Sequence, residues 1–214
     1  MNELRKATAH FKKVDQKLFL AWKELSKESQ RTIEHKLSRR LKAPALFEDI
    51  CWTIIGQQLS GKAANTIFSR FKKLCGRVTP GVVSKKSIED FRAVGISYAK
   101  GRALHDLASK TSEKTLLIKR FESMSDEEVV QALVTVRGVG PWTAEMTLMF
   151  SLGRPDVFSA GDLGLQKSIQ QIYNLKKRPS RHDMDRLSKK WSPYRTYASL
   201  ILWRHLDSIQ KNTK

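Results

Sequence analysis

Cysteine is scarce in this sequence of 214 residues, and no pattern of metal ligands replaces it. Cys51 and Cys75 are the only cysteines. Two are too few for a disulfide framework, a four-cysteine zinc site or an iron–sulfur cluster. The five histidines show no metal-ligand spacing either. We therefore expect both cysteines to be small core residues, and we expect the protein to need no cofactor.

Long apolar runs are absent as well. No run approaches the ~20 residues that a membrane-spanning helix needs, and segment 1–17 lacks the apolar stretch of a signal peptide. We expect a soluble intracellular protein that has no membrane partner. In a bacterium it would lie in the cytoplasm or nucleoid, and in a eukaryote in the nucleus.

Strand-like alternation is hard to find, and no repeat or low-complexity segment is present. Apolar residues instead recur at helical spacing. Two examples are the stripe Phe11, Val14, Leu18, Trp22 and Leu25 and the stripe Ala63, Ala64, Ile67, Phe68, Phe71 and Leu74. Ser60, Ser97, Ser125 and Ser180 stand where helix N-caps are expected. The sequence predicts an all-α protein of about ten short helices, forming one compact unit over residues 1–214.

Acidic residues are few relative to basic ones. The 21 Asp and Glu residues against 40 Lys and Arg residues leave a formal net charge of +19. Such an excess costs self-repulsion and indicates a polyanionic partner, with nucleic acid first and an anionic membrane surface second. A basic surface that serves only solubility stays open. Basic clusters are spread along the chain, so charge alone does not locate the binding face.

The most informative stretch is residues 136–144, VRGVGPWTA. Gly138 and Gly140 allow a positive φ and a close approach of backbone, and Val139 between them can tuck into a helix pair. Pro141 suits the first turn of the next helix. Outward-pointing amides and a helix N-terminus would then bind a DNA phosphate without reading the base sequence. An ordinary turn between two helices remains the alternative.

This stretch resembles the hairpin of the helix-hairpin-helix base-excision DNA glycosylase superfamily. The resemblance implies that Gly138, Val139, Gly140 and Thr143 bind DNA. Arg137 departs from the family pattern, which usually has proline at that position. Members with lyase activity carry a lysine at the position of Trp142, and its amine attacks the sugar. The resemblance is therefore to the 3-methyladenine DNA glycosylase II type, and it implies a monofunctional enzyme without lyase activity.

The resemblance extends to residues 157–167, VFSAGDLGLQK, where Asp162 takes the place of the family's catalytic aspartate. A fixed anion stabilises the oxocarbenium character that develops on a sugar when its glycosidic bond breaks. An N3- or N7-alkylated purine already carries a positive charge and departs as a neutral base, so one carboxylate can suffice. A purely structural role for Asp162, as the cap of a helix beginning at Leu163, stays open. Asp156 is the second candidate for the catalytic carboxylate.

Four side chains are candidates for the base pocket. Trp142 suits a cationic base, because the face of an indole attracts positive charge. Trp203 matches a pocket tryptophan of the family's last helix, although core packing is an equal alternative. Met146 lies one turn after Trp142, where some relatives have tyrosine. Trp52 stands where relatives tend to carry arginine, and it is either a pocket wall or a core residue.

Residues 47–64 resemble the family's helix-loop-helix that enters the minor groove. Flipping a base out of the duplex leaves a hole that a side chain must fill. The resemblance makes Gln58 or Leu59 this plug and adds Lys62 to the DNA contacts. The alternative is that the two glutamines simply end a helix. Residues 95–102 match another family loop, in which Lys100 would contact a phosphate.

The resemblance runs from about Phe47 to Trp203 and implies a two-lobed helical fold with a cleft between the lobes. Residues 45–140 would form the middle lobe, residues 1–44 and 141–214 the second lobe, and residues 136–144 the hairpin. A monovalent cation could bind the backbone carbonyls of Val134, Val136 and Val139, although no metal is required.

The implied function is the hydrolysis of N-glycosidic bonds of alkylated purines such as 3-methyladenine and 7-methylguanine. The implied partner is double-stranded DNA containing damaged bases, bound by a monomer in base-excision repair. Two alternatives stay open: a non-catalytic helix-hairpin-helix module that binds DNA or senses damage, and a glycosylase for uracil, hypoxanthine or mismatches.

Overall fold

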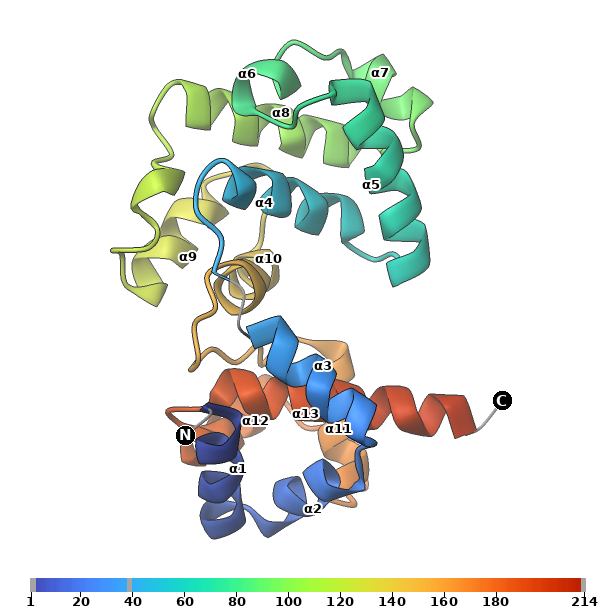
Figure 1. Cartoon of the computed structure of the whole chain (residues 1–214), viewed down its shortest axis with the longest axis vertical. Helices are drawn as coiled ribbons and strands as arrows, with labels where there is room; N and C mark the ends of the chain where they lie inside the picture. Colours follow the sequence, from blue (N-terminus) through green and yellow to red (C-terminus); the bar gives the residue numbers. More distant parts are fainter. Residues whose placement is uncertain (1–2, 38–39, 213–214) are drawn as a thin grey trace. The chain divides into compact units, whose positions relative to one another are not determined.

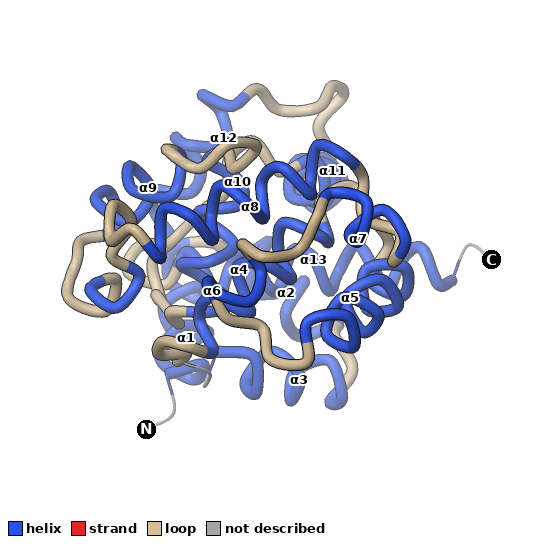
Figure 2. The backbone as a smooth tube through the Cα atoms, turned by 90° about the horizontal axis from the view of Figure 1, so that it is seen from above, coloured by secondary structure: helices blue, strands red, loops and turns tan. Residues whose placement is uncertain are grey.

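The computed structural model describes residues 3–37 and 40–212, and these consist of helices and connecting loops with no strand among them (Figures 1 and 2). The predicted all-α fold class is confirmed. The described ranges hold thirteen α-helices, three more than the round number expected. The parts of the predicted lobes that fall on residues 1–2, 38–39 and 213–214 lie outside the described residues.

Packing divides the chain into two compact units. Unit 1 joins Met1–Arg39 to Gly153–Lys214, and unit 2 is Arg40–Leu152. The helix that follows the hairpin therefore belongs to the same unit as the hairpin. The lobe boundaries expected from the sequence, and the cleft between the lobes, stay predictions.

Unit 2 is built around helix α4 (Ala45–Gly56), most of whose residues are buried. Its apolar side chains Leu46, Phe47, Ile50, Cys51, Ile54 and Ile55 are all buried. The helix packs against α5 (Gly61–Cys75), α8 (Tyr98–Ser112), α10 (Pro141–Met146) and the π-helical turn η2 (Thr147–Ser151) (Figure 1). The remaining elements are α6 (Pro80–Val83), α7 (Ile88–Ala93), the 3₁₀ turn η1 (Ile118–Arg120) and α9 (Asp126–Val134).

The predicted capping serines begin helices as expected. The hydroxyl oxygens of Ser60, Ser97 and Ser125 accept hydrogen bonds of 3.3, 3.3 and 3.2 Å from backbone amides three residues later. These bonds satisfy amides that have no partner within the helix. Both cysteines are buried, as predicted for core residues, and burial raises the pKa of each thiol.

Unit 1 gathers helices from both ends of the chain. Its N-terminal helices are α1 (Glu3–Val14), α2 (Gln16–Glu24) and α3 (Lys27–Leu37). Its C-terminal elements are α11 (Leu163–Ile172), α12 (Arg181–Ser188), the 3₁₀ turn η3 (Lys189–Trp191) and α13 (Arg195–Asn212). Helix α13 packs against α2, α3 and α11, which ties the two ends together.

The apolar stripe from Phe11 to Leu25 does not lie on one helix. It is divided at Asp15, whose side chain accepts a 3.2 Å hydrogen bond from the amide of Leu18 and so begins α2. Val14, at the end of α1, is 38% exposed. A helix N-cap therefore interrupts a pattern that periodicity alone makes continuous.

Asp15 is the polar centre of unit 1, and only 5% of it is exposed. Besides the Leu18 amide, its carboxylate accepts hydrogen bonds from three side chains of the C-terminal segment. The donors are the hydroxyl of Tyr173, Nε1 of Trp191 at 2.7 Å and Nζ of Lys190 at 3.0 Å. Burial alone would raise the pKa of Asp15, but these donors together hold it below its ordinary value.

Replacing this carboxylate with an amide is expected to weaken the fold in a pH-dependent way. Asp15→Asn should lower the free energy of unfolding by about 2–4 kcal/mol at pH 7, because it removes a buried, charge-assisted network. The folded-state pKa of Asp15 is lowered, so its contribution is present above the ordinary pKa and is lost as pH falls through the folded-state value. Urea unfolding at neutral and acid pH should show the difference from wild type shrinking in acid.

The matched control is Asp185→Asn, because Asp185 is an exposed carboxylate on α12 of the same unit. That substitution should change stability by less than about 0.5 kcal/mol. Equal stability of the Asp15→Asn variant and the wild type at pH 7 would contradict the role given to Asp15.

Candidate functional site

The predicted hairpin connects α9 to α10 in unit 2. Gly138 has a φ of +75°, and a Cβ added there would lie 3.4 Å from Cβ of Ala103. Gly140, by contrast, has an extended φ of −100° and is the N-cap of α10, so only the first glycine needs left-handed backbone. Val139 is 5% exposed and Pro141 is the first residue of α10, both as predicted.

Two side chains of α8 hold the start of the hairpin. Oδ2 of Asp106 accepts a 2.7 Å hydrogen bond from the amide of Arg137 and a 2.6 Å bond from Nζ of Lys110. Lys110 also donates to the carbonyl of Thr135 at 2.9 Å. Burial opposes ionisation of Asp106, but these donors lower its pKa. The four-residue spacing of Asp106 and Lys110 is visible in the sequence, whereas their contact with the hairpin is not.

The turn between α4 and α5 carries the predicted plug. Gln58 has a left-handed φ of +57°, and both Gln58 and Leu59 are exposed. Their neighbour Gln57 was not a predicted site residue. Its Nε2 donates to the carbonyl of Gly138 at 3.1 Å and to Oγ1 of Thr143 at 2.9 Å. Thr143 is itself 2% exposed, so its side chain serves this contact inside unit 2.

Lys100 lies behind the same turn. Its Nζ donates to the carbonyls of Ile55 and Gln57 at 2.8 and 2.7 Å, and burial lowers the pKa of its ammonium group. The ammonium group therefore binds carbonyls at the C-terminal end of α4, where a cation is favourable. The predicted phosphate contact of Lys100 stays a prediction. Lys62, in the first turn of α5, is exposed.

The pocket candidates of unit 2 differ in burial. Trp142, in the first turn of α10, is 37% exposed, and Met146 one turn later is buried. Trp52 on α4 is also 37% exposed, and its Nε1 donates a 3.2 Å hydrogen bond to Oδ1 of Asn65 on α5. Trp52 therefore joins two helices rather than packing in the core.

In unit 1 the structure brings Asp162 and Trp203 together. Asp162 is the N-cap of α11, and its Oδ1 accepts a 2.8 Å hydrogen bond from the amide of Leu165. The same oxygen accepts a 3.0 Å bond from Nε1 of Trp203 on α13. The capping role is thus real, and it coexists with a direct contact between two predicted site residues.

Asp156, the second candidate, has a structural environment at the start of α13. Its carboxylate accepts bonds from Nε and Nη2 of Arg195 at 2.9 and 3.1 Å, and from Oγ of Ser192 at 2.7 Å. The Arg195 amide adds a bond of 3.1 Å. Burial alone would raise the pKa of Asp156, but these donors lower it. A bidentate ion pair accounts for this residue without a catalytic role.

The predicted cation site consists of backbone oxygens. The carbonyl of Val136 accepts a 3.0 Å hydrogen bond from the Val139 amide. A carbonyl oxygen has a second lone pair, which could bind a cation. Carbonyls of this kind suit a hard cation, and the site on Val134, Val136 and Val139 stays a prediction. Within residues 3–37 and 40–212, no group of three His, Cys, Asp or Glu side chains could hold a metal ion.

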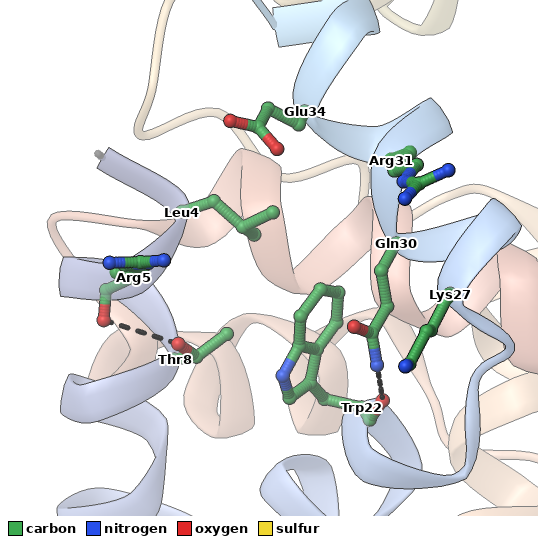
Figure 3. Close-up of a pocket in the computed structure, with 8 residues that line it drawn as sticks. All are labelled: Leu4, Arg5, Thr8, Trp22, Lys27, Gln30, Arg31 and Glu34. Atoms are coloured by element: carbon green, nitrogen blue, oxygen red, sulfur yellow. Dashed lines mark hydrogen bonds between the residues drawn. The ribbon is translucent and has the colours of Figure 1, made fainter.

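Two further features of the described residues lie outside the predicted site. No helix in the described part of the chain is long and apolar enough to cross a membrane. Unit 1 also contains a groove of about 430 Å³ beside α1, α2 and α3 (Figure 3). It is lined by Leu4, Arg5, Thr8, Trp22, Lys27, Gln30, Arg31 and Glu34. None of these is a predicted site residue.

Comparison with known proteins identifies the family. Residues 51–193 match the family described as "HhH-GPD superfamily base excision DNA repair protein". DNA-3-methyladenine glycosylase 1 of Schizosaccharomyces pombe is 32% identical over 208 residues, covering 95% of this chain and 88% of that protein. YfjP of Bacillus subtilis is 36% identical over 162 residues, which cover 72% of this chain but only 56% of YfjP.

A solved structure agrees over nearly the whole chain. The structure of S. pombe 3-methyladenine DNA glycosylase (Mag1) in complex with abasic DNA superposes with a TM-score of 0.78 at 31% identity. The match covers 93% of this chain and 95% of that one. The resemblance inferred from the hairpin and the aspartate is confirmed. The chain therefore belongs to the HhH-GPD superfamily of base excision DNA repair proteins.

Proposed function

We propose that this protein is a DNA-3-methyladenine glycosylase that hydrolyses the N-glycosidic bond of alkylated purines in double-stranded DNA. The observation that carries the proposal is the carboxylate of Asp162, whose Oδ1 is fixed by the Leu165 amide and the Trp203 indole. The names of the S. pombe relative and of the Mag1 structure support the same activity.

One fixed carboxylate is enough for this chemistry. When the bond between C1′ and the base nitrogen breaks, its electron pair goes to the cationic purine, which leaves as a neutral base. Positive charge develops on the sugar, and the anion of Asp162 stabilises it. Water then adds to C1′ and loses a proton, which gives an abasic site. The two N–H donors on Oδ1 keep the carboxylate oriented, so little reorganisation is needed at the moment of reaction.

Selection of the damaged base falls to aromatic side chains. Trp142, with 37% of its surface exposed, offers an indole face that attracts a cationic base more than a neutral one. Met146 and Trp52 in the same unit, and Trp203 in unit 1, are the other proposed base contacts. Position 142 holds no lysine, so no amine is available there to form a Schiff base. We therefore assign the enzyme to the 3-methyladenine glycosylase II type without lyase activity.

DNA binding rests on backbone and positive charge. The hairpin around Gly138 and Gly140 would hold a phosphate through its amides, and the net charge of +19 supplies the long-range attraction. Gln58 or Leu59, both exposed in the turn after α4, would fill the space of the flipped base.

Base release from methylated DNA tests the activity. The wild type should release 3-methyladenine or 7-methylguanine, and Asp162→Asn should lower the single-turnover rate by at least about a hundredfold, because the developing sugar charge loses its anion. Asp185→Asn, an exposed control in the same unit, should retain the wild-type rate.

Three outcomes would contradict parts of the proposal. Tight binding of methylated DNA by the wild type without base release would make the protein a binding module. Release only from uracil, hypoxanthine or mismatched DNA would exclude alkylated purines as the substrate. A covalent adduct trapped by borohydride would overturn the absence of lyase activity.

Gly164 tests how closely the carboxylate is fixed. A Cβ on Gly164 would lie 3.1 Å from Oδ1 of Asp162 and 3.3 Å from Nε1 of Trp203. Gly164→Ala should therefore displace both groups by a few tenths of an ångström and lower the excision rate about tenfold. It should also shift the indole N–H resonance of Trp203. Because alanine favours the helix by about 1 kcal/mol over glycine, loss of folding is not expected.

Gly161→Ala is the matched control, since a Cβ there meets nothing within 4 Å. The Gly161 variant should keep the indole resonance and the rate. An unchanged resonance and rate in Gly164→Ala would show that Asp162 tolerates displacement and would refute its tight fixation.

A further inference from the structure

We propose that helix α8 is the positioning element of unit 2, holding the hairpin and the turn after α4 in one fixed register. Asp106 on α8 accepts a hydrogen bond from the backbone amide of Arg137, and Lys100 on α8 donates one to the carbonyl of Gln57 in the turn. The inference rests on the proposed function only in that it takes these two segments as the ones that contact DNA.

The residues concerned lie on one face of α8. Lys100, Ala103, Asp106 and Lys110 are separated by three, three and four residues, which is the spacing of neighbours along one side of an α-helix. Ala103 is 2% exposed, and its Cβ lies where the left-handed Gly138 comes closest. A small residue at the centre of this face lets the hairpin backbone approach between polar anchors.

The first anchor acts on the start of the hairpin. Oδ2 of Asp106 accepts a 2.7 Å hydrogen bond from the amide of Arg137, and Nζ of Lys110 donates a 2.9 Å bond to the carbonyl of Thr135. Lys110 is also paired with Asp106 at 2.6 Å, which offsets the negative charge of the carboxylate. The anchor can therefore stand beside a phosphate-binding segment without the repulsion of an isolated anion.

The second anchor acts on the turn and ties it to the hairpin. Lys100 holds the carbonyls of Ile55 and Gln57, while the side chain of Gln57 reaches the carbonyl of Gly138 and the hydroxyl of Thr143. The next residue, Gln58, has a left-handed backbone, which a non-glycine residue keeps only where its surroundings enforce it. Gln57 and Lys100 supply that enforcement.

Because α8 fixes both the hairpin and the turn after α4, it would also fix their positions on DNA. The side chain that fills the space of the flipped base must enter the duplex at a fixed position relative to the phosphates that the hairpin binds. A displacement of the turn or of the hairpin would therefore misplace that side chain in the duplex. A misplacement of about 1 Å can cost about a hundredfold in rate. Gln57, Lys100 and Asp106 are thus positioning residues, and none of them needs to touch DNA.

A double-mutant cycle tests the first anchor, because proline has no amide proton to give to Asp106. The probe is a duplex with a tetrahydrofuran abasic-site analogue, and its Kd is measured by fluorescence anisotropy. Asp106→Ala should raise Kd about five- to tenfold in the wild-type background and less than about twofold in the Arg137→Pro background. An equal effect in both backgrounds would overturn the role of Asp106.

Gln57→Leu tests the second anchor and stays informative if the proline variants do not fold. The matched control is Gln30→Leu, because the Gln30 amide also donates to two acceptors, the carbonyls of Trp22 and Leu25, but in unit 1. Gln57→Leu should lower single-turnover base release about tenfold and reduce the fluorescence rise of 2-aminopurine placed beside the tetrahydrofuran. Gln30→Leu should lower Tm to a similar extent and leave both signals near wild type.

The readouts separate the two proposals. Equal excision rates and fluorescence in the Gln57 and Gln30 variants would overturn the positioning role of α8. If the wild type released no base, the proposed activity would fail. The Kd and 2-aminopurine measurements would still decide for or against α8, because the tetrahydrofuran probe has no base to excise.

Discussion

One carboxylate oxygen, Oδ1 of Asp162, accepts the Leu165 amide and the Trp203 indole N–H at once. The first bond begins α11 and the second attaches the carboxylate to α13, so folding of unit 1 itself sets the orientation of the group. Gly164 leaves room for this arrangement, since a Cβ there would press on Oδ1 of Asp162 and on the indole of Trp203. A carboxylate that serves as a helix cap is already ordered before substrate arrives, which is the condition for electrostatic stabilisation of a developing charge.

In unit 2 the group to be fixed is main chain rather than a side chain. Its hairpin would bind phosphate through main-chain groups, and a loop with two glycines has little side-chain packing to hold it. The fixing groups therefore come from elsewhere in the unit: Asp106 and Lys110 from α8, and Gln57 from the turn after α4. A buried helix, α4, and a polar face of α8 together give the exposed segments a rigid support.

Local signals in the sequence were sufficient for the helix starts, the hairpin and the capping position of Asp162. Each depends on residues within four positions of one another, as with Ser125 and Glu128 or Gly140 and Pro141. The contacts of Asp15 with the C-terminal segment and the role of Gln57 were not predictable in this way. Their partners lie as far as 176 and 86 residues along the chain, and no local pattern encodes such contacts.

Several aspartates of this basic chain are fixed by hydrogen bonds from identified donors. Asp15, Asp106 and Asp156 are paired with Lys190, Lys110 and Arg195, so each of their charges is balanced by a cation. Oδ1 of Asp162 accepts hydrogen bonds from two neutral N–H groups, the Leu165 amide and the Trp203 indole. Neutral donors fix the position of a carboxylate without cancelling its charge. A fixed anion is what the catalytic role proposed for Asp162 requires, because positive charge develops on the sugar when the glycosidic bond breaks.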